Sequence, residues 1–189
     1  MKILVTGGTG FIGSHTCVEL LEAGHDVVII DNLYNSQADV IDKIKTITGK
    51  DVAFYESDCC DEEALETIFN EHKIDAAIHF AGYKAVGESV AKPIMYYQNN
   101  LMSTLALCKV MAKHGCKRLV FSSSATVYGN PKSVPIKEDF PLGPTTNPYG
   151  TTKLMIEQIL KDLYISDHEW NIALLRYFNP IGAHASGLL

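Results

Sequence analysis

Short runs of apolar and β-branched residues alternate with helix-like stretches along almost the whole chain. We expect strands at residues 3–5, 27–30, 52–55, 76–79, 119–121 and 172–175. We expect helices at residues 12–23, 37–47, 61–71, 94–113 and 149–166. Strands joined through helices run parallel, and parallel strands covered on both faces are apolar along their length. The sequence therefore predicts an α/β fold with one parallel sheet and helices on both faces.

Size and charge exclude several classes of function. The 189 residues suit one domain, and 47% hydrophobic with 20% charged residues is ordinary for a soluble globular protein. The formal net charge is −6 and the basic residues form no cluster, so we expect no nucleic-acid partner. No stretch approaches the roughly 20 apolar residues of a membrane helix, and Gly7 and Gly8 interrupt the N-terminal apolar run. We therefore expect a cytoplasmic protein without membrane contact.

The cysteines and histidines show no metal-binding pattern. The five cysteines are odd in number and have no CxxC spacing, and the seven histidines are dispersed without an HxxxH pair. We expect the cysteines to be reduced packing residues and the protein to have no metal site.

A glycine-rich turn follows the first expected strand, in the sequence Gly-Gly-Thr-Gly-Phe-Ile-Gly at residues 7–13. Gly7 permits a sharp turn, Gly10 lets the backbone approach a pyrophosphate, and Gly13 lets the helix pack on the sheet. Free N–H groups at the helix start then favour the anion. Asp31, at the end of the second strand, suits ribose hydroxyls and would repel the extra phosphate of NADP. Together these features predict a Rossmann-type doubly wound sheet that binds NAD. The alternative is a tight turn followed by a solvated strand end.

A second group of residues suits hydride chemistry. Tyr149 and Lys153 are four residues apart and share a helix face, and Ser124 follows the fifth expected strand. A tyrosine with a pKa of ~10 is a poor base at neutral pH, and a neighbouring ammonium lowers that pKa. Tyr149 can then take the proton of a substrate hydroxyl as hydride leaves the same carbon, while Ser124 holds that hydroxyl. The alternative is an exposed helix with an incidental Tyr–Lys pair.

These motifs together resemble the short-chain dehydrogenase/reductase superfamily, in its extended branch that modifies nucleotide sugars. The segment His-Phe-Ala-Gly-Tyr-Lys-Ala-Val-Gly-Glu-Ser-Val at 79–90, followed by Pro93 and by Tyr-Tyr-Gln-Asn-Asn at 96–100, is similar to the UDP-glucose 4-epimerases, also called UDP-galactose 4-epimerases. Segments 14–16, 122–129 and 174–182 fit the same family, so the resemblance spans essentially the whole chain.

The resemblance implies roles for individual residues. The cofactor NAD would be bound by Gly7, Gly10, Phe11, Ile12, Gly13, Asp31, Asn32, Asn35, Ser36, Asp58, Cys59, Phe80, Ala81, Gly82, Lys84, Asn99, Ser124, Tyr149, Lys153 and Phe178. Tyr83 lies within the same 80–84 segment, and Cys59 departs from the family's more usual residue beside the adenine. The UDP-sugar would contact Lys84, Ser124, Tyr149 and Asn179. The catalytic residues would be Tyr149, Lys153 and Ser124.

The resemblance also implies a reaction, the interconversion of UDP-glucose and UDP-galactose. Tyr149 would remove the proton of the C4 hydroxyl while NAD takes the C4 hydride. The resulting 4-keto sugar would turn over in the site and receive the hydride on its other face. The net change is inversion at C4, and NAD remains bound.

Members of this family continue into a smaller C-terminal domain that supplies most substrate contacts, whereas this chain ends at Leu189. We therefore expect residues 1–189 to be a truncated NAD-binding domain, with the substrate domain absent and little or no activity alone. Such a domain would leave a sheet edge and apolar surface exposed. The resemblance further implies a homodimer through the helices at 94–113 and 149–166, although the same apolar stripes could instead cover the sheet.

Two other functions fit parts of the pattern. An NAD-dependent nucleotide-sugar dehydratase or dehydrogenase would share the cofactor site, but dehydratases usually place an acid beside the catalytic serine, and here Ala125 and Thr126 follow Ser124. Net release of NADH would favour that function. A non-enzymatic NAD-sensing module would keep all its function after Tyr149→Phe.

Overall fold

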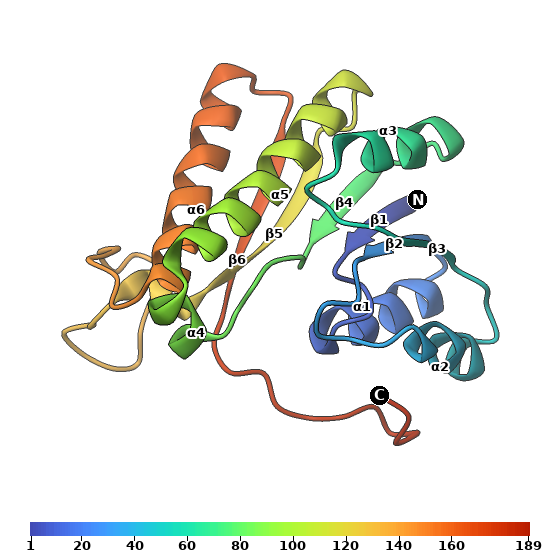
Figure 1. The fold of residues 1–189 in the computed structure, drawn as a ribbon, viewed down its shortest axis with the longest axis horizontal. Helices are drawn as coiled ribbons and strands as arrows, with labels where there is room; N and C mark the ends of the chain where they lie inside the picture. Colours follow the sequence, from blue (N-terminus) through green and yellow to red (C-terminus); the bar gives the residue numbers. More distant parts are fainter.

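A six-stranded sheet forms the centre of the computed structural model, which describes residues 1–189 (Figure 1). The strands are β1 (Lys2–Thr6), β2 (Asp26–Asp31), β3 (Ala53–Glu56), β4 (Ala76–His79), β5 (Arg118–Ser124) and β6 (Asn171–Tyr177). Their order is β3-β2-β1-β4-β5-β6, and every neighbouring pair is parallel. The chain thus winds outward from β1 to β3, returns to β4 beside β1, and winds the other way to β6.

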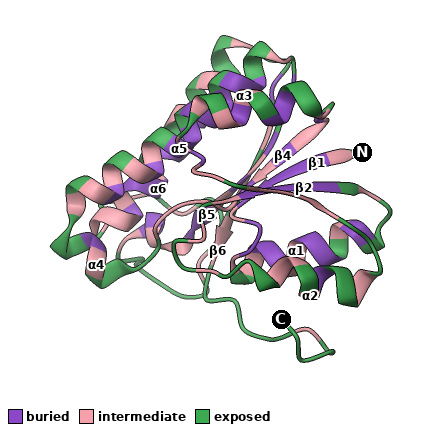
Figure 2. Cartoon of the chain, turned by 45° about the vertical axis from the view of Figure 1, so that its right-hand side comes forward, coloured by how far each residue is buried: buried purple, intermediate pink, exposed green.

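Helices cover both faces of the sheet, as Figures 1 and 2 show. They are α1 (Phe11–Glu22), α2 (Asp39–Thr48), α3 (Glu62–Glu71), α4 (Val86–Ala91), α5 (Pro93–Lys113) and α6 (Pro148–Ser166), with a 3-10 turn η1 (Ala125–Tyr128). Helices α1 and α2 lie on one face, and α3, α5 and α6 lie on the other. The predicted α/β fold, a doubly wound parallel sheet with helices on both faces, is confirmed.

Two apolar cores hold these layers together. The larger one has 20 buried residues and packs α3, α5 and α6 on the sheet, through side chains such as Ile68, Leu107 and Ile156. The smaller one has 8 buried residues and packs α1 and α2 on the opposite face, through side chains such as Val18 and Ile44. Burying one such aliphatic side chain contributes roughly 1.5–3 kcal/mol. The two cores therefore fix the sheet from both sides around β1, β2 and β4.

Two elements differ from the sequence expectation. The helix expected at 94–113 is preceded by α4, a six-residue helix that shows no clear apolar periodicity. Pro93 separates the two because it has no N–H to continue α4 and instead begins α5. Strand β5 also runs on to Ser124, because its serines pair with the end of β6, with Ser124 opposite Tyr177. Serine has a low strand propensity, so the tertiary pairing decides this extension.

The β5–β6 end of the sheet has an open face. Strand β6 is an edge strand, and on it Ala173 is exposed and Leu175 is 42% exposed. A shallow apolar groove lies nearby, lined mainly by β4, β5 and β6. The expected exposed edge and apolar surface are therefore present. No helix is long and apolar enough to cross a lipid bilayer.

The contact between the glycine turn and α1 generates a first prediction. A Cβ on Gly13 would lie 2.2 Å from the Gly7 carbonyl oxygen and 2.8 Å from the Gly8 Cα, both of them backbone atoms. Gly13→Ala should therefore destabilise the chain by ~1–3 kcal/mol, because the backbone must move apart. Urea unfolding measures this. Gly87→Ala is the matched control, since nothing lies within 4 Å of its added Cβ. Equal stability of the two variants would contradict the prediction.

Candidate cofactor and hydride-transfer site

A cavity of about 320 Å³ lies at the carboxyl ends of the strands. Its lining comes from the segments that follow all six strands, so it crosses the point between β1 and β4 where the winding reverses. Ligands of open parallel sheets bind at this switch point, because the two connections diverge there and leave a crevice. The residues lining the cavity are therefore the candidate functional residues.

The glycine turn and the start of α1 form the floor of this cavity. Gly7 has a φ of 70°, in the left-handed region that favours glycine. Gly10 caps α1 without any side-chain hydrogen bond. The N–H groups of Phe11, Ile12 and Gly13 lie in the first turn and have no helical acceptor. The floor thus offers N–H donors and the positive end of the helix dipole to an anion.

The Asp31 carboxylate is held by donors from two loops. Its Oδ2 accepts from the Thr9 backbone N–H at 3.1 Å, and its Oδ1 accepts from the Leu33 N–H at 3.0 Å and the Ser36 hydroxyl at 3.2 Å. Ser36 is also within 2.7 Å of the Thr9 hydroxyl. Ser36 does not line the cavity; it lies beside Asp31 and orients that carboxylate.

Asp58 and Cys59 line the cavity at the end of β3. Asp58 accepts from the Asn32 amide at 3.0 Å and from the Cys60 N–H at 2.8 Å, so two neighbouring loops are tied together. Burial raises the pKa of the Cys59 thiol, which therefore stays protonated. Cys59 is thus a neutral wall of the cavity and not a nucleophile.

Asn100, which the sequence analysis did not identify, holds the 80–84 segment in place. Its buried amide accepts from the Tyr83 N–H at 2.8 Å and donates to the Tyr83 carbonyl at 3.0 Å. It also donates to the Thr152 hydroxyl at 3.1 Å and accepts from the Asn99 amide at 3.0 Å. Asn100 thus links the loop after β4 to α6 beside Lys153.

The start of α6 positions Tyr149. The Asn147 side chain accepts from the Gly150 N–H at 2.8 Å and caps the helix, and Pro148 occupies its first turn. A Cβ on Gly150 would lie 3.2 Å from the Thr126 side chain, so glycine lets α6 approach η1 closely. The cap and this close approach bring Tyr149 to the end of β5, where Ser124 lies.

Lys153 is buried one turn further along α6. Its Nζ donates to the Ser122 carbonyl at 2.8 Å and lies 4.7 Å from the centroid of the Phe121 ring. Burial lowers the pKa of Lys153 to about 8. The ammonium therefore lies beside the serine strand end with no carboxylate partner.

The pKa of Tyr149 differs from the sequence expectation. Burial raises this pKa, and the nearby Ser124 hydroxyl offsets only part of the increase. Lys153 does not offset this burial, because its Nζ is 6.0 Å from the tyrosine ring centroid and is hydrogen bonded to Ser122. Tyr149 is therefore a protonated phenol at neutral pH unless further positive charge approaches it.

A buried ion pair, also absent from the sequence analysis, fixes the ends of β5 and β6. The fully buried Glu157 carboxylate accepts from the Ser123 hydroxyl at 2.6 Å and from two Arg176 nitrogens at 2.9 and 2.8 Å. Burial opposes the charge of Glu157, but these donors outweigh it and hold its pKa below the ordinary value. Arg176 also donates to the Glu138 carbonyl at 3.0 Å, within the loop at 129–147 that joins η1 to α6. Glu157 follows Lys153 by four residues, as Lys153 follows Tyr149, so the three share one face of the helix. This spacing is the sequence signal that could have identified Glu157.

The structure brings the predicted site residues together around the one cavity. All of them except Ser36 line it, from Gly7 on the β1 side to Phe178 and Asn179 after β6. Lining residues that the sequence analysis did not single out are Ile30, Tyr34, Val86, Ser103, Ser122, Ser123, Thr126, Tyr177 and Pro180. Most of them are neighbours of predicted residues in the same loops, and their residue types alone carry no signal of cofactor chemistry.

A family model described as the NAD dependent epimerase/dehydratase family matches residues 3–188. The chain belongs to this family. Among its curated relatives, the UDP-glucose 4-epimerase of Bacillus subtilis (strain 168) is 64% identical over 187 residues, covering 99% of this chain and 55% of that protein. The UDP-glucose 4-epimerase of Neisseria meningitidis serogroup A is 60% identical over 188 residues, covering 100% of this chain and 56% of that protein. The chain thus spans about half the length of these curated epimerases.

Solved structures of epimerases share the fold closely. A UDP-glucose 4-epimerase from Bifidobacterium longum, in complex with NAD+ and UDP, has a TM-score of 0.99 at 59% identity and covers 100% of this chain and 56% of its own. One from Stenotrophomonas maltophila, with bound NAD and formylated UDP-arabinopyranose, has a TM-score of 0.97 at 49% identity, again covering 100% and 56%. The resemblance to the UDP-glucose 4-epimerases is therefore confirmed.

The buried ammonium of Lys153 generates a prediction on stability against pH. Its folded pKa of about 8 lies below the unfolded value of ~10.4, so the folded state loses its proton first. The resulting penalty is fully present below pH ~8 and disappears as the pH rises to ~10.4. Lys153→Met should therefore stabilise the chain at pH 7, by up to ~3 kcal/mol, and the gain should vanish near pH 10.5. Urea unfolding of both proteins at a series of pH values measures the difference.

Lys161→Met is the matched control, because Lys161 lies on the same helix and is exposed. It should show no comparable change with pH. A constant stability difference between Lys153→Met and the original chain from pH 7 to pH 10.5 would contradict the prediction.

Proposed function

We propose that this chain is the NAD-binding and hydride-transfer part of an enzyme that interconverts UDP-glucose and UDP-galactose. The observation that carries the proposal is that Ser124, Tyr149 and Lys153 line the same cavity as the glycine turn and Asp31. This shared cavity supports a site in which an acid–base group acts beside a bound dinucleotide. Epimerases at 64% and 60% identity support the reaction type.

The residues of the cavity fit NAD. A Cβ on Gly7 would lie 2.8 Å from the Ala81 backbone nitrogen, so the turn can only be built with glycine and leaves its backbone open to a pyrophosphate. The N–H groups of the first turn of α1 would hold the phosphate oxygens. The oriented Asp31 carboxylate would accept hydrogen bonds from both ribose hydroxyls, and it would repel the extra phosphate of NADP. When bound, NAD supplies the acceptor for the sugar's C4 hydride and then the donor that returns it.

The side chains of Ser124 and Lys153 are arranged for proton handling. Ser124 Oγ accepts from the Thr126 N–H at 3.2 Å and from the Thr126 hydroxyl at 3.0 Å, so its own proton remains available to donate to the Tyr149 oxygen or to a substrate oxygen. Lys153 has three N–H donors, of which Ser122 takes one, and two remain for the cofactor ribose. Because burial raises the pKa of Tyr149, positive charge close to the phenol is needed before it removes the C4 hydroxyl proton.

We propose that residues 1–189 form a truncated NAD-binding domain that completes its substrate site with contacts from a further domain. Lys84, Phe178 and Asn179 line the cavity but are exposed, with Phe178 at 59%. The curated epimerases are nearly twice as long as the aligned segment. The chain alone should therefore bind NAD and turn over UDP-sugars weakly or not at all. Its five free cysteines suit a reducing compartment, and we propose a cytoplasmic location.

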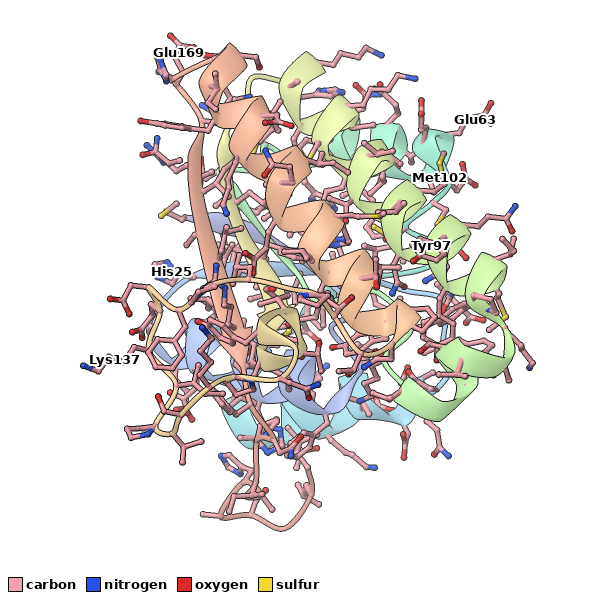
Figure 3. All side chains as sticks on the ribbon, turned by 90° about the vertical axis from the view of Figure 1, so that its left-hand side faces the viewer. His25, Glu63, Tyr97, Met102, Lys137 and Glu169 are labelled. Carbon is pink, nitrogen blue, oxygen red and sulfur yellow. The ribbon has the colours of Figure 1, made fainter.

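We further propose a homodimer through α5 and α6. The two helices pack side by side, and Figure 3 shows this face with Tyr97 and Met102 labelled on α5. Met102 is 47% exposed and Leu105 is 42% exposed on α5, and Met155 is 44% exposed on α6. Exposed apolar side chains grouped on paired helices are typical of a surface that a second copy covers.

Calorimetry with NAD+ tests the proposed cofactor site on the 189-residue chain. Saturable binding is expected, and Asp31→Ala should weaken it by about tenfold or more, because a charge-assisted hydrogen bond to ribose is lost. Asp162→Ala is the matched control, since Asp162 is exposed on α6 away from the cavity. Absence of binding to the original chain, or equal binding by Asp31→Ala, would overturn the proposed cofactor site.

Light scattering tests the dimer. At high protein concentration the chain should show twice its monomer mass, and Met102→Lys should shift it to the monomer by burying an unpaired charge. Val134→Lys is the control, because Val134 is 81% exposed in the 129–147 loop, outside α5 and α6. A monomer mass for the original chain would count against the dimer.

A further inference from the structure

Two tyrosines from different loops meet at the cavity. Tyr34 follows β2 and Tyr83 follows β4, and these strands are separated by β1 in the sheet. Their ring centroids are 4.6 Å apart with an interplanar angle of 43°, and both residues line the cavity. The pair thus bridges the two loops on either side of the glycine turn that follows β1.

Tyr83 is the fixed member of this pair. Both its N–H and its carbonyl are hydrogen bonded to the buried Asn100 side chain, at 2.8 and 3.0 Å. Its ring lies 5.5 Å from the ring of Tyr96, which is fully buried. The Tyr96 hydroxyl in turn donates to Glu88 at 3.0 Å and accepts from the Ala85 N–H at 3.1 Å. Tyr83 is therefore held by the protein on its backbone and on its ring.

Tyr34 is the loosely held member. It is 54% exposed, and its hydroxyl makes no hydrogen bond. Its backbone N–H donates to the Asn32 side chain at 3.1 Å, which orders the backbone of the loop. The preceding Leu33 has a φ of 57°, a left-handed conformation that is uncommon for this residue type. The Tyr34 ring is therefore held through its contact with the Tyr83 ring.

The pair lies at the end of the cavity that carries the ribose-binding carboxylate. Tyr34 stands between Asn32 and Asn35, and all three line the cavity close to Asp31 in the chain. On the other side, Tyr83 is near enough to Asp58 for that carboxylate to help raise its pKa, after burial and Tyr34. The rings therefore cover the part of the cavity between the loops after β2 and β3 and the loop after β4.

We propose that Tyr34 and Tyr83 form a gate over the Asp31 end of the cavity, which sets the rate at which NAD(H) enters and leaves. This inference rests on the proposed function of the cavity. The rings must part before a dinucleotide passes between the two loops, and they meet again over the bound cofactor. Tyr83 is the fixed side of the gate, and Tyr34 is the side that moves.

The test measures NADH association and dissociation rates on the 189-residue chain by stopped-flow fluorescence. Tyr34→Ala should raise both rates by about two- to tenfold, the range expected for loss of one aromatic pair, with a smaller change in the dissociation constant. Tyr34→Phe retains the ring and should match the original chain. The double variant Tyr34→Ala/Tyr83→Ala should exchange NADH no faster than Tyr34→Ala alone, because the pair acts as a unit.

Tyr164→Ala is the matched control. Tyr164 is 47% exposed and contacts the His168 ring at 5.0 Å, but it lies on α6 and does not line the cavity. The NADH association and dissociation rates of Tyr164→Ala should equal those of the original chain. A rise in the dissociation rate alone would show that Tyr34 only contacts the cofactor and would overturn the gate, as would unchanged rates in Tyr34→Ala. If the original chain binds no NADH, the proposed cofactor site itself fails. If it binds NADH and Tyr34→Ala leaves both rates unchanged, only the gate fails.

Discussion

Backbone packs directly on backbone where the glycine turn meets α1 and the 80–84 segment. The hypothetical Cβ atoms of Gly13 and Gly7 would lie 2.2 and 2.8 Å from neighbouring backbone atoms, so no side chain fits at either position. This contact sets the distance of α1 from β1 and brings the loop after β4 against the turn. The floor of the cavity, the free N–H groups of α1 and the position of Tyr83 all depend on it.

Around this floor, buried polar groups fix the reactive side chains. Lys153 is anchored on the Ser122 carbonyl, and the Glu157–Arg176 pair anchors the adjacent Ser123 and ties β5 to β6. Buried charges are tolerated only where donors and acceptors replace water. These contacts fix the end of β5, and with it the position of Ser124 relative to α6.

The two ends of the cavity differ in how completely these residues enclose them. At the Asp31 end, that carboxylate is held by several donors, and the Tyr34 and Tyr83 rings are in contact across the neighbouring loops. At the opposite end, after β6, the lining residue Phe178 is 59% exposed. An enclosed end beside an exposed one agrees with the proposal that contacts from a further domain complete the site, in a segment that spans about half of the curated epimerases.

The pattern of residues by itself determined the parallel α/β fold, the glycine turn, Asp31 and the Ser124, Tyr149 and Lys153 set. These follow from local rules, since strand and helix periodicity, turn chemistry and helical spacing are short-range properties. Only the tertiary structure decided that Asn100 and Glu157 hold these groups, that Ser36 lies behind Asp31, and that Tyr34 meets Tyr83. It also decided that burial raises the pKa of Tyr149, against the lowering by Lys153 that the spacing predicts. These features depend on distances between segments far apart in the chain and on burial from water, and neither quantity is contained in the spacing of residues along one strand or helix.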